Sequence, residues 1–148
     1  VLDKVQQEVG KFLSANPDKT ARDVTIACFG LAFKPDIDDL RESPIVEVIE
    51  RLLGKGYDLR IYDRNVNLAS LMGANRDYIL NRIPHISKLM MNNVNGVLDH
   101  AETVVVGNKD PEFKEVLNGN LRQDQTVIDL VRVMEQPVQH DNYEGLSW

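Results

Sequence analysis

The stretch VTIACFG at residues 24–30 is an apolar, β-branched run of strand length that ends in glycine, which predicts a buried β-strand. Ser43-Pro44 then supplies a helix N-cap followed by proline at the first helical position, and an apolar stripe at helical spacing predicts a helix over 44–54. DLRIYD at 58–63 follows as a second strand. Because parallel strands need a long crossover, this strand-helix-strand order indicates a parallel sheet.

Further elements extend the same pattern. TVVVGN (103–108) and QTVIDLV (125–131) are strands, PEFKEVL (111–117) is a short helix, and apolar residues at helical spacing predict a first helix that ends before Asn16-Pro17. The region 65–100 carries helical pieces around 66–72, 75–82 and 94–101 and a short strand near 86–91, whereas the tail 135–148 is polar.

The expected architecture is an α/β fold: a Rossmann-like open parallel sheet with helices on both faces, preceded by an N-terminal helix. We expect the strands in the spatial order 58–63, 24–30, 103–108, 125–131. Open α/β sheets bind ligands outside the carboxyl ends of their strands, where the strand order reverses. The loops after Gly30, Val106 and Asp129 are therefore the places to search for a site.

Composition limits the classes of function. The 148 residues correspond to one domain, and 17 basic against 23 acidic residues give a net charge of −6, which argues against nucleic-acid binding by charge alone. Any anion site must be local. A single cysteine, Cys28, excludes an internal disulfide, and no stretch approaches the roughly 18 apolar residues of a membrane span, so we expect a cytosolic (cytoplasmic) protein without membrane contact. The missing initiator Met suggests a piece of something longer.

The loop GLAFKPDIDDLRESP at 30–44 concentrates Phe33, Lys34 and Arg41 at the predicted site. An aromatic face, an ammonium and a guanidinium together can hold a base or sugar and a pyrophosphate; the alternative is a solvated loop whose charges neutralise one another. Arg132 follows the last strand beside the same crevice, either as a phosphate or base contact or as an ordinary surface arginine.

Several site types lack their sequence signature. The first strand ends in the single Gly30, and neither G-x-G-x-x-G nor G-x-x-x-x-G-K-[ST] occurs, so the fold has no dinucleotide fingerprint of its own. Asp63 ends the second strand, where an acid can contact ribose, but a turn or helix-cap role fits better without the glycine loop. Cys28 lies in a predicted buried strand and is expected to act as a small apolar group. The three histidines show no ligand spacing, so we expect no metal site.

These residues carry a resemblance to a known family. The pattern G-x-[AS]-F-K, a short acidic stretch and R-E-S at 30–43, with IYD at 61–63, VVVGNKDPEF at 104–113 and VIDL at 127–130, resembles the C-terminal domain of the UDP-glucose/GDP-mannose dehydrogenase family. The likeness covers about 22–148. GNKD, DDLRESP and the C-terminal EG-x-x-W look more like the GDP-mannose 6-dehydrogenases than the UDP-glucose enzymes.

The resemblance implies an oxidoreductase activity. Family members oxidise the C6 alcohol of a nucleotide sugar to a carboxylate, as in GDP-mannose to GDP-mannuronate, with two NAD and a covalent cysteine intermediate. An N-terminal Rossmann domain holds NAD, a helical middle supplies the dimer interface and the nucleophile, and the C-terminal domain closes over the nucleotide sugar. By this resemblance Phe33 and Lys34 would contact the nucleotide sugar and Arg41 would reach towards NAD.

The same resemblance sets the domain expectations. Residues 1–21 would be the end of a helix from a preceding middle domain plus a connector, and 22–148 the nucleotide-sugar-binding domain of a homodimer or higher homo-oligomer. No catalytic residue is expected in this chain, because Cys28 does not match the family's nucleophile. UDP-type members carry D-G-R at the end of the last strand, where this chain has Asp129, Leu130, Val131 and Arg132. The alternatives are a UDP-sugar 6-dehydrogenase domain, a non-catalytic flavodoxin-like signalling module, and a purely structural or oligomerisation domain.

Overall fold

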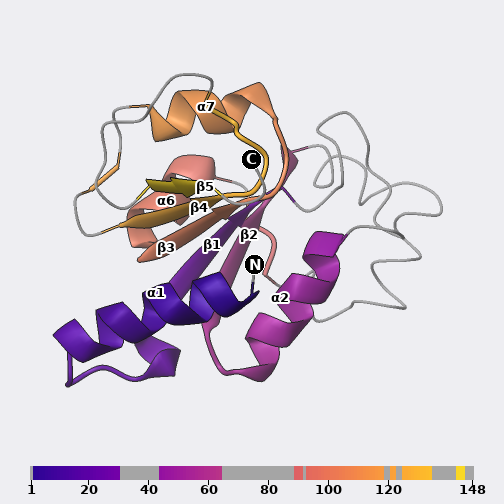
Figure 1. The fold of residues 1–148 in the computed structure, drawn as a ribbon. Coiled ribbons are helices and arrows are strands. Elements are labelled where there is room, and N and C mark those ends of the chain that lie inside the picture. Colours follow the sequence, from indigo (N-terminus) through magenta and orange to yellow (C-terminus); the bar gives the residue numbers. More distant parts are fainter. Residues whose placement is uncertain are drawn as a thin grey trace.

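A five-stranded parallel sheet in the order β2-β1-β3-β4-β5 forms the centre of the molecule (Figure 1). The computed structural model describes residues 2–30, 44–64, 89–91, 93–118, 121–122, 125–134 and 143–145. The strands are β1 (Thr25–Phe29), β2 (Asp58–Tyr62), β3 (Thr103–Val106), β4 (Thr126–Asp129) and β5 (Tyr143–Gly145). The first four stand in the spatial order that the sequence predicts, and every pairing is parallel.

The strand β5 is absent from the sequence-based prediction, which treats 135–148 as a polar tail. It is only three residues long and extends the sheet by pairing Tyr143 with Val127 and Gly145 with Asp129. Its formation depends on this pairing with β4 rather than on an apolar run of its own. The end of β5 therefore lies beside the carboxyl end of β4.

Among the described residues, helices cover both faces of the sheet (Figure 1). On one face lie α1 (Leu2–Ala15) and α2 (Pro44–Gly54), and on the other α6 (Val94–His100) and α7 (Pro111–Leu117). A short 3-10 turn, η1 (Ala21–Asp23), leads into β1. The doubly covered parallel sheet confirms the predicted architecture. The helical pieces expected around 66–72 and 75–82 lie outside the described residues.

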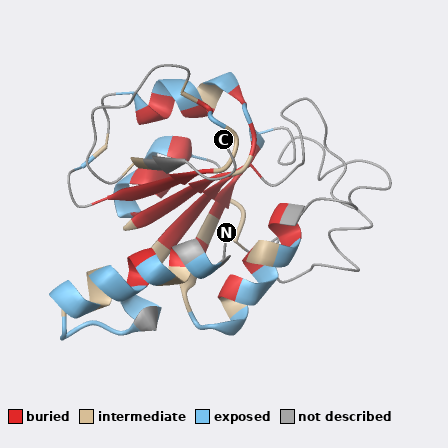
Figure 2. Cartoon of the chain, viewed as in Figure 1, coloured by how far each residue is buried: buried red, intermediate tan, exposed pale blue. Residues whose placement is uncertain are grey.

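The core divides into two layers because alternate side chains of a strand point to opposite faces. Ile26 and Cys28 of β1 belong to the layer under α1 and α2, whereas Ala27 and Phe29 belong to the layer under α6 and α7. Phe29 stacks on Phe113 with ring centroids 5.0 Å apart. Figure 2 shows the central strands buried along their length. Burial on both faces explains why these strands read as apolar runs rather than as alternating ones.

Helix α1 packs onto the sheet of this chain. Val5 and Val9 are buried and share a core cluster with Val105 of β3 and Ile128 of β4. Their four-residue spacing puts both side chains on the same face of the helix, and that face contacts the sheet. The assignment of residues 1–21 to a preceding domain stays a prediction.

A short segment also borders the outer edge of β2. Ile61 N–H donates to the Leu89 carbonyl (3.0 Å), Met91 N–H donates to the Ile61 carbonyl (2.8 Å), and Met90 bridges Ile61 in parallel. The expected strand near 86–91 thus appears as a single bridge at Met90, with 86–88 outside the described residues.

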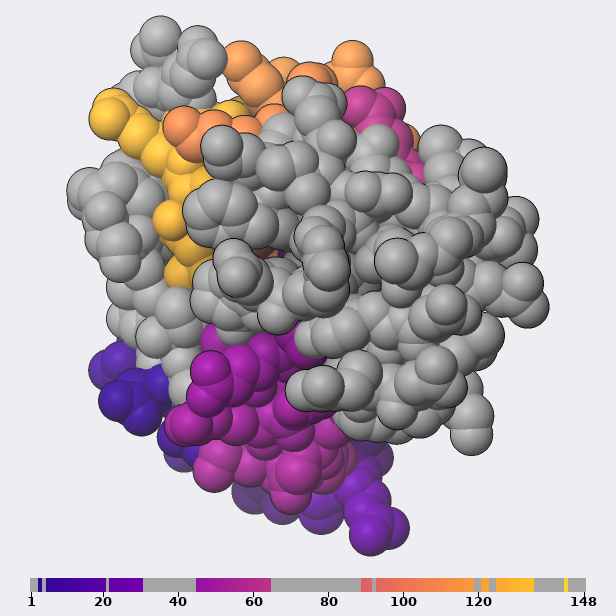
Figure 3. All heavy atoms as spheres, turned by 90° about the vertical axis from the view of Figure 1, so that its right-hand side faces the viewer, coloured from indigo at the N-terminus to yellow at the C-terminus, as the bar shows by residue number. Residues whose placement is uncertain are grey.

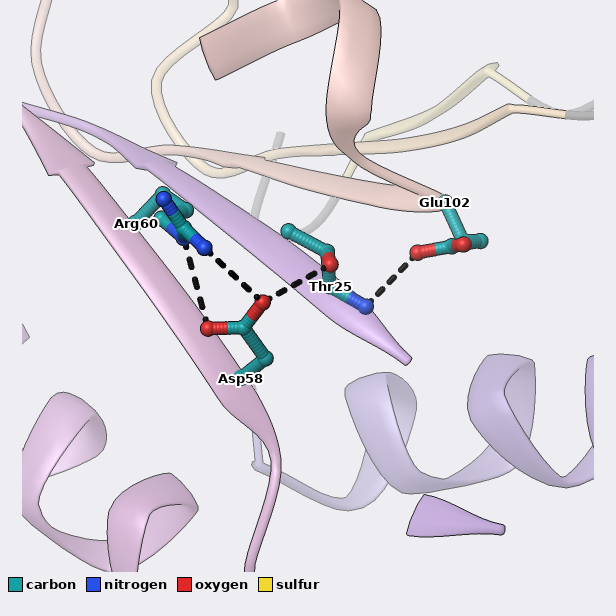
Figure 4. A network of polar contacts seen from close by, with 4 residues as sticks. All are labelled: Thr25, Asp58, Arg60 and Glu102. Atoms are coloured by element: carbon teal, nitrogen blue, oxygen red, sulfur yellow. Dashed lines mark hydrogen bonds and ion pairs between the residues drawn. The ribbon is translucent and has the colours of Figure 1, made fainter. Parts of the chain in front are cut away.

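A polar network fixes the amino edge of the sheet, opposite the ends where a ligand is expected (Figure 4). The Thr25 amide donates to Glu102 Oε2 (2.6 Å), and the Thr25 hydroxyl donates to Asp58 Oδ2 (3.1 Å). Arg60 in turn pairs with Asp58 at 3.3 Å. These contacts join the starts of β1, β2 and β3, so we interpret the network as structural.

Candidate functional site

The carboxyl ends of β1 and β3 approach each other closely at the point where the strand order reverses. Gly30 has φ +95°, and a Cβ built on it would lie 2.6 Å from Asn108 Cγ and 2.9 Å from the Asn108 backbone nitrogen. At Gly107 a Cβ would lie 2.9 Å from Ile45 Cγ1 and 3.0 Å from the Gly30 carbonyl oxygen. Any side chain here would force the two strand ends apart, so the centre of this edge is built of closely packed backbone.

Asp63 and Asn108 join the ends of β2 and β3. Both are buried, and Asn108 Nδ2 donates to Asp63 Oδ2 at 3.3 Å. Asn108 Oδ1 accepts the Asp110 amide at 3.2 Å. The Asp63 carboxylate therefore points into the protein and bridges two strand ends, while the turn or helix-cap role suggested by the sequence stays a prediction.

Arg64 and Asp110 form a bidentate ion pair next to this link. Arg64 Nε donates to Asp110 Oδ2 and Arg64 Nη2 lies against Asp110 Oδ1, both at 2.8 Å. Asp110 is buried and caps α7 by accepting the Glu112 amide at 3.0 Å, while Arg64 remains half exposed. The Asp110 carboxylate raises the pKa of the Arg64 guanidinium. Arg64 is thus a fixed, permanently charged cation at the edge of the site.

Tyr62 lies beneath this ion pair. Its ring meets Phe113 edge-on at 6.3 Å between centroids. Burial and a hydrogen bond with Glu112 raise the pKa of the Tyr62 hydroxyl above its usual value. The hydroxyl therefore stays protonated and acts as a donor at neutral pH.

Asp129 organises the turn that follows β4. Its side chain is fully buried; Oδ1 accepts the Val131 amide (3.1 Å), and Oδ2 accepts the Val133 amide (3.0 Å) and the Tyr143 hydroxyl (2.5 Å). Burial, together with the hydrogen bond to Asp129, raises the pKa of Tyr143. A carboxylate that accepts several hydrogen bonds is stable in the interior because the charge is solvated by protein donors.

Arg132 stands at the apex of that turn, between the two amides that Asp129 binds. It has φ 57°, and within the described residues it is the one non-glycine residue with positive φ. Its side chain is exposed. Figure 3 looks from the side where the carboxyl ends lie and shows atoms of residues 125–134, in yellow-orange, at the molecular surface. The structure thus places Arg132 at the edge where the sequence predicted it.

The other predicted site residues, Phe33, Lys34 and Arg41, lie outside the described residues. Cys28 is buried in β1, and burial raises the pKa of its thiol to about 12, which removes it as a nucleophile at neutral pH. Sequence reasoning did not single out Arg64 or Lys109, two cations that follow the carboxyl ends of β2 and β3; Lys109 is exposed. Their position directly after strand ends was the available signal.

Sequence reasoning also missed the contact between Asp129 and Tyr143. An acidic residue within the otherwise apolar stretch VIDLV (127–131) was a signal that Asp129 would need buried donors. Nothing local in the sequence pointed to Tyr143 as one of them, because the two residues meet only when β5 pairs with β4.

A separate pocket of about 210 Å³ opens beside α6, on the face away from α1 and α2. It is lined by Arg60, Met91, Asn93, Gly96, Val97 and His100. Arg60 belongs to the amino-edge network, and the remaining lining residues come from α6 and its approach. The pocket is therefore distinct from the strand ends that face the predicted crevice.

Among the described residues there is neither a metal-ligand cluster nor a membrane-spanning helix. In the part of the chain that the structure describes, no three His, Cys, Asp or Glu side chains gather closely enough to hold a metal ion. None of the helices among those same residues combines the length and apolar character that crossing a bilayer requires.

Known proteins are similar to this chain in sequence and in fold. Residues 27–136 match the UDP binding domain of the UDP-glucose/GDP-mannose dehydrogenase family. The chain belongs to this family. The match runs from within β1 through β4 and the turn after Asp129, so the carboxyl ends of β1 to β4 are part of the family's domain.

Individual relatives agree with this assignment. The chain is 48% identical over 124 residues to a GDP-mannose 6-dehydrogenase of Pseudomonas putida, which covers 83% of this chain and 28% of that protein. A shorter stretch of 48 residues is 65% identical to a UDP-N-acetyl-D-mannosamine dehydrogenase of Yersinia pestis, covering 32% of this chain and 11% of the relative. The chain therefore spans less than a third of the length of these relatives.

The fold also matches a solved structure. A ternary complex of GDP-mannose dehydrogenase from Pseudomonas aeruginosa superposes with a TM-score of 0.76 at 38% identity, covering 97% of this chain and 32% of that one. The superposition therefore extends beyond residues 27–136 of the family match.

The described residues do not fit NAD, the cofactor that the family implies. A pyrophosphate at the end of the first strand of a Rossmann fold needs glycines that leave open space beside the backbone. Here the space beside Gly30 is filled by Asn108, whose side chain lies 2.6 Å from a Cβ built there. Asp63 is turned inward to Asn108 and is not available to a ribose. The end of β1 in this chain is therefore not a dinucleotide site.

Proposed function

We propose that this chain is the nucleotide-sugar-binding domain of an NAD-dependent GDP-mannose 6-dehydrogenase, which oxidises the C6 alcohol of the sugar to a carboxylate. The observation that carries the choice of substrate is the 48% identity over 124 residues to the enzyme of Pseudomonas putida. In this proposal the chain holds the nucleotide sugar and closes the site, while NAD and the nucleophilic cysteine belong to other parts of the whole protein. Residues 1–21 would be the end of a helix from the middle domain plus a connector.

The proposed ligand site is the carboxyl edge of the sheet. Phe33 and Lys34, from the loop after β1, and Arg132, from the turn after β4, would contact the nucleotide sugar, and Arg41 would reach towards NAD. A diphosphate is a dianion that guanidinium and ammonium groups recognise by charge and paired hydrogen bonds. The buried Asp63 and Asp129 each accept hydrogen bonds from protein groups, so these carboxylates need not repel such a ligand.

The same proposal covers the whole protein's other properties. We infer a homodimer or higher homo-oligomer and a cytoplasmic location, the latter from the unpaired Cys28 and the nucleotide-sugar ligand. Because the chain would supply only one side of a closed cleft, we expect weak binding and no catalysis by the chain alone.

The experiment is a comparison of substrates with the complete protein. Reduction of NAD is followed with GDP-mannose and with UDP-glucose, and the expected result is turnover of GDP-mannose with a lower KM than that of UDP-glucose. Turnover of neither nucleotide sugar would overturn the proposal. Lys34→Ala should raise the KM, because it removes a cation proposed to contact the nucleotide sugar.

A UDP-sugar substrate is the second candidate, favoured by the 65% identity over 48 residues to a UDP-N-acetyl-D-mannosamine dehydrogenase. That stretch is only 32% of this chain, against the 83% that aligns with the GDP-mannose enzyme. Preferential turnover of a UDP-sugar in the same assay would select this candidate.

A further inference from the structure

The turn after β4 holds an arginine in a conformation that arginine rarely adopts. Arg132 has φ 57°, in the left-handed region, where a Cβ crowds the following carbonyl group. Glycine would occupy this position without strain. A strained, exposed side chain at the edge of a proposed binding site is a reason to look for the groups that maintain the strain.

Asp129 supplies those groups on both sides of Arg132. Its carboxylate accepts the Val131 amide at 3.1 Å and the Val133 amide at 3.0 Å, the residues directly before and after the arginine. Val133 is also buried, which anchors the far end of the turn in the core under α6 and α7. The backbone on either side of Arg132 is therefore fixed, while the arginine itself is exposed at the apex of the turn.

Tyr143 of β5, 14 positions beyond Asp129 in the sequence, completes the arrangement. Its hydroxyl donates to Asp129 Oδ2 at 2.5 Å, the oxygen that also accepts the Val133 amide at 3.0 Å. Pairing of β5 with β4 sets Tyr143 beside Val127, so the position of the ring is determined by the sheet. Its raised pKa keeps the hydroxyl protonated and able to donate.

We propose that Asp129 and Tyr143 are positioning residues that hold Arg132 in its left-handed conformation, so that its guanidinium is presented to the diphosphate of the nucleotide sugar. The inference rests on the proposed function, since it needs Arg132 to contact the ligand. It adds that β5, through Tyr143, controls the affinity of the site. Tyr143 acts through Asp129, Asp129 acts through the two amides, and only Arg132 meets the ligand.

A double-mutant cycle on ligand affinity tests this chain of contacts. Affinity for GDP-mannose is measured by NMR titration for the unaltered protein, Tyr143→Phe, Arg132→Ala and the double variant. Tyr143→Phe removes one hydroxyl and keeps the ring. We expect it to weaken binding about three- to tenfold when Arg132 is present and by less than about twofold in the Arg132→Ala background.

Controls separate positioning from a general effect on the fold. Tyr57→Phe removes a hydroxyl from the residue before β2, at the opposite edge of the sheet, and should leave the affinity unchanged. If Tyr143→Phe does not fold, Asp129→Asn takes its place in the cycle, because the amide keeps the size of the side chain while its nitrogen cannot accept the hydrogen bonds of Val133 and Tyr143.

The possible results distinguish this inference from the proposed function. Equal weakening by Tyr143→Phe in both backgrounds means a merely structural role and overturns the inference. If Arg132→Ala weakens binding and Tyr143→Phe does not, the inference fails while the proposed contact stands. If Arg132→Ala has no effect although GDP-mannose binds, Arg132 is not a ligand contact and the positioning role falls with it.

Discussion

Substitution of Gly30 by alanine tests the close approach of β1 and β3 that shapes the proposed site. Two separate costs are expected. Gly30 has φ +95°, a conformation that costs a residue with a Cβ about 1–2 kcal/mol. The new methyl group would also lie 2.6 Å from Asn108 Cγ and 2.9 Å from the Asn108 backbone nitrogen, and such overpacking costs about 1–3 kcal/mol. The free energy of unfolding should therefore fall by about 2–5 kcal/mol.

Gly56 provides a matched control for the first of these costs. It has φ +89°, yet a Cβ built on it meets no atom within 4 Å. Gly56→Ala should consequently show only the conformational cost of about 1–2 kcal/mol. Both variants are compared with the unaltered protein by urea unfolding, with unchanged slopes confirming that only stability has changed. If Gly30→Ala is no more destabilising than Gly56→Ala, the inferred contact between Gly30 and Asn108 is wrong.

Three further perturbations probe other parts of the fold. In urea unfolding, Asp110→Ala should lower the free energy of unfolding by about 1–2 kcal/mol, because it removes the cap of α7. Asp110→Asn keeps an acceptor oxygen and should lower it less, so equal losses would argue against the cap. Val9→Ala should lower the free energy of unfolding by about 2 kcal/mol, measured by thermal or urea unfolding, because it removes two buried methyl groups. Substitution of the exposed Gln7 by alanine should leave stability unchanged. If Val9→Ala does not change stability, α1 does not pack on the sheet. Burial raises the pKa of Cys28 to about 12, so the thiol should not react with Ellman's reagent at pH 8 until urea unfolds the protein. In the unfolded chain it ionises near pH 8.5, so unfolding releases a proton and stability should fall as pH rises from about 8.5 towards 12, a trend that Cys28→Ala should reduce.

The sheet could be predicted because its determinants are local. VTIACFG, TVVV and TVID are largely apolar runs typical of strands in a doubly covered sheet, and α2 begins at Pro44, as the proline predicts. The strand β5 could not be predicted from YEG alone, because three residues with one aromatic side chain form a strand only when a neighbouring strand provides the pairing.

The sequence predicted which strand ends meet at one edge of the sheet, but not the local structure at those ends. The order of the strands places the ends of β1, β3 and β4 at one edge, which is why the sequence directed attention to Arg132. Its left-handed backbone was not predictable, because DLVR contains no glycine and the conformation arises from hydrogen bonds of Asp129 to the flanking amides. The inward orientation of Asp63 could not be predicted either, because its partner Asn108 is 45 positions away in the sequence.

The most direct test of the account is to locate the nucleotide sugar on the sheet. GDP-mannose is titrated into the ¹⁵N-labelled protein, and amide shifts are followed at both edges. The account predicts that the largest changes occur at the carboxyl edge, around Gly30, Asn108 and the turn at Arg132. Changes concentrated instead at the amino edge, around Thr25 and Glu102, or beside α6 would contradict it.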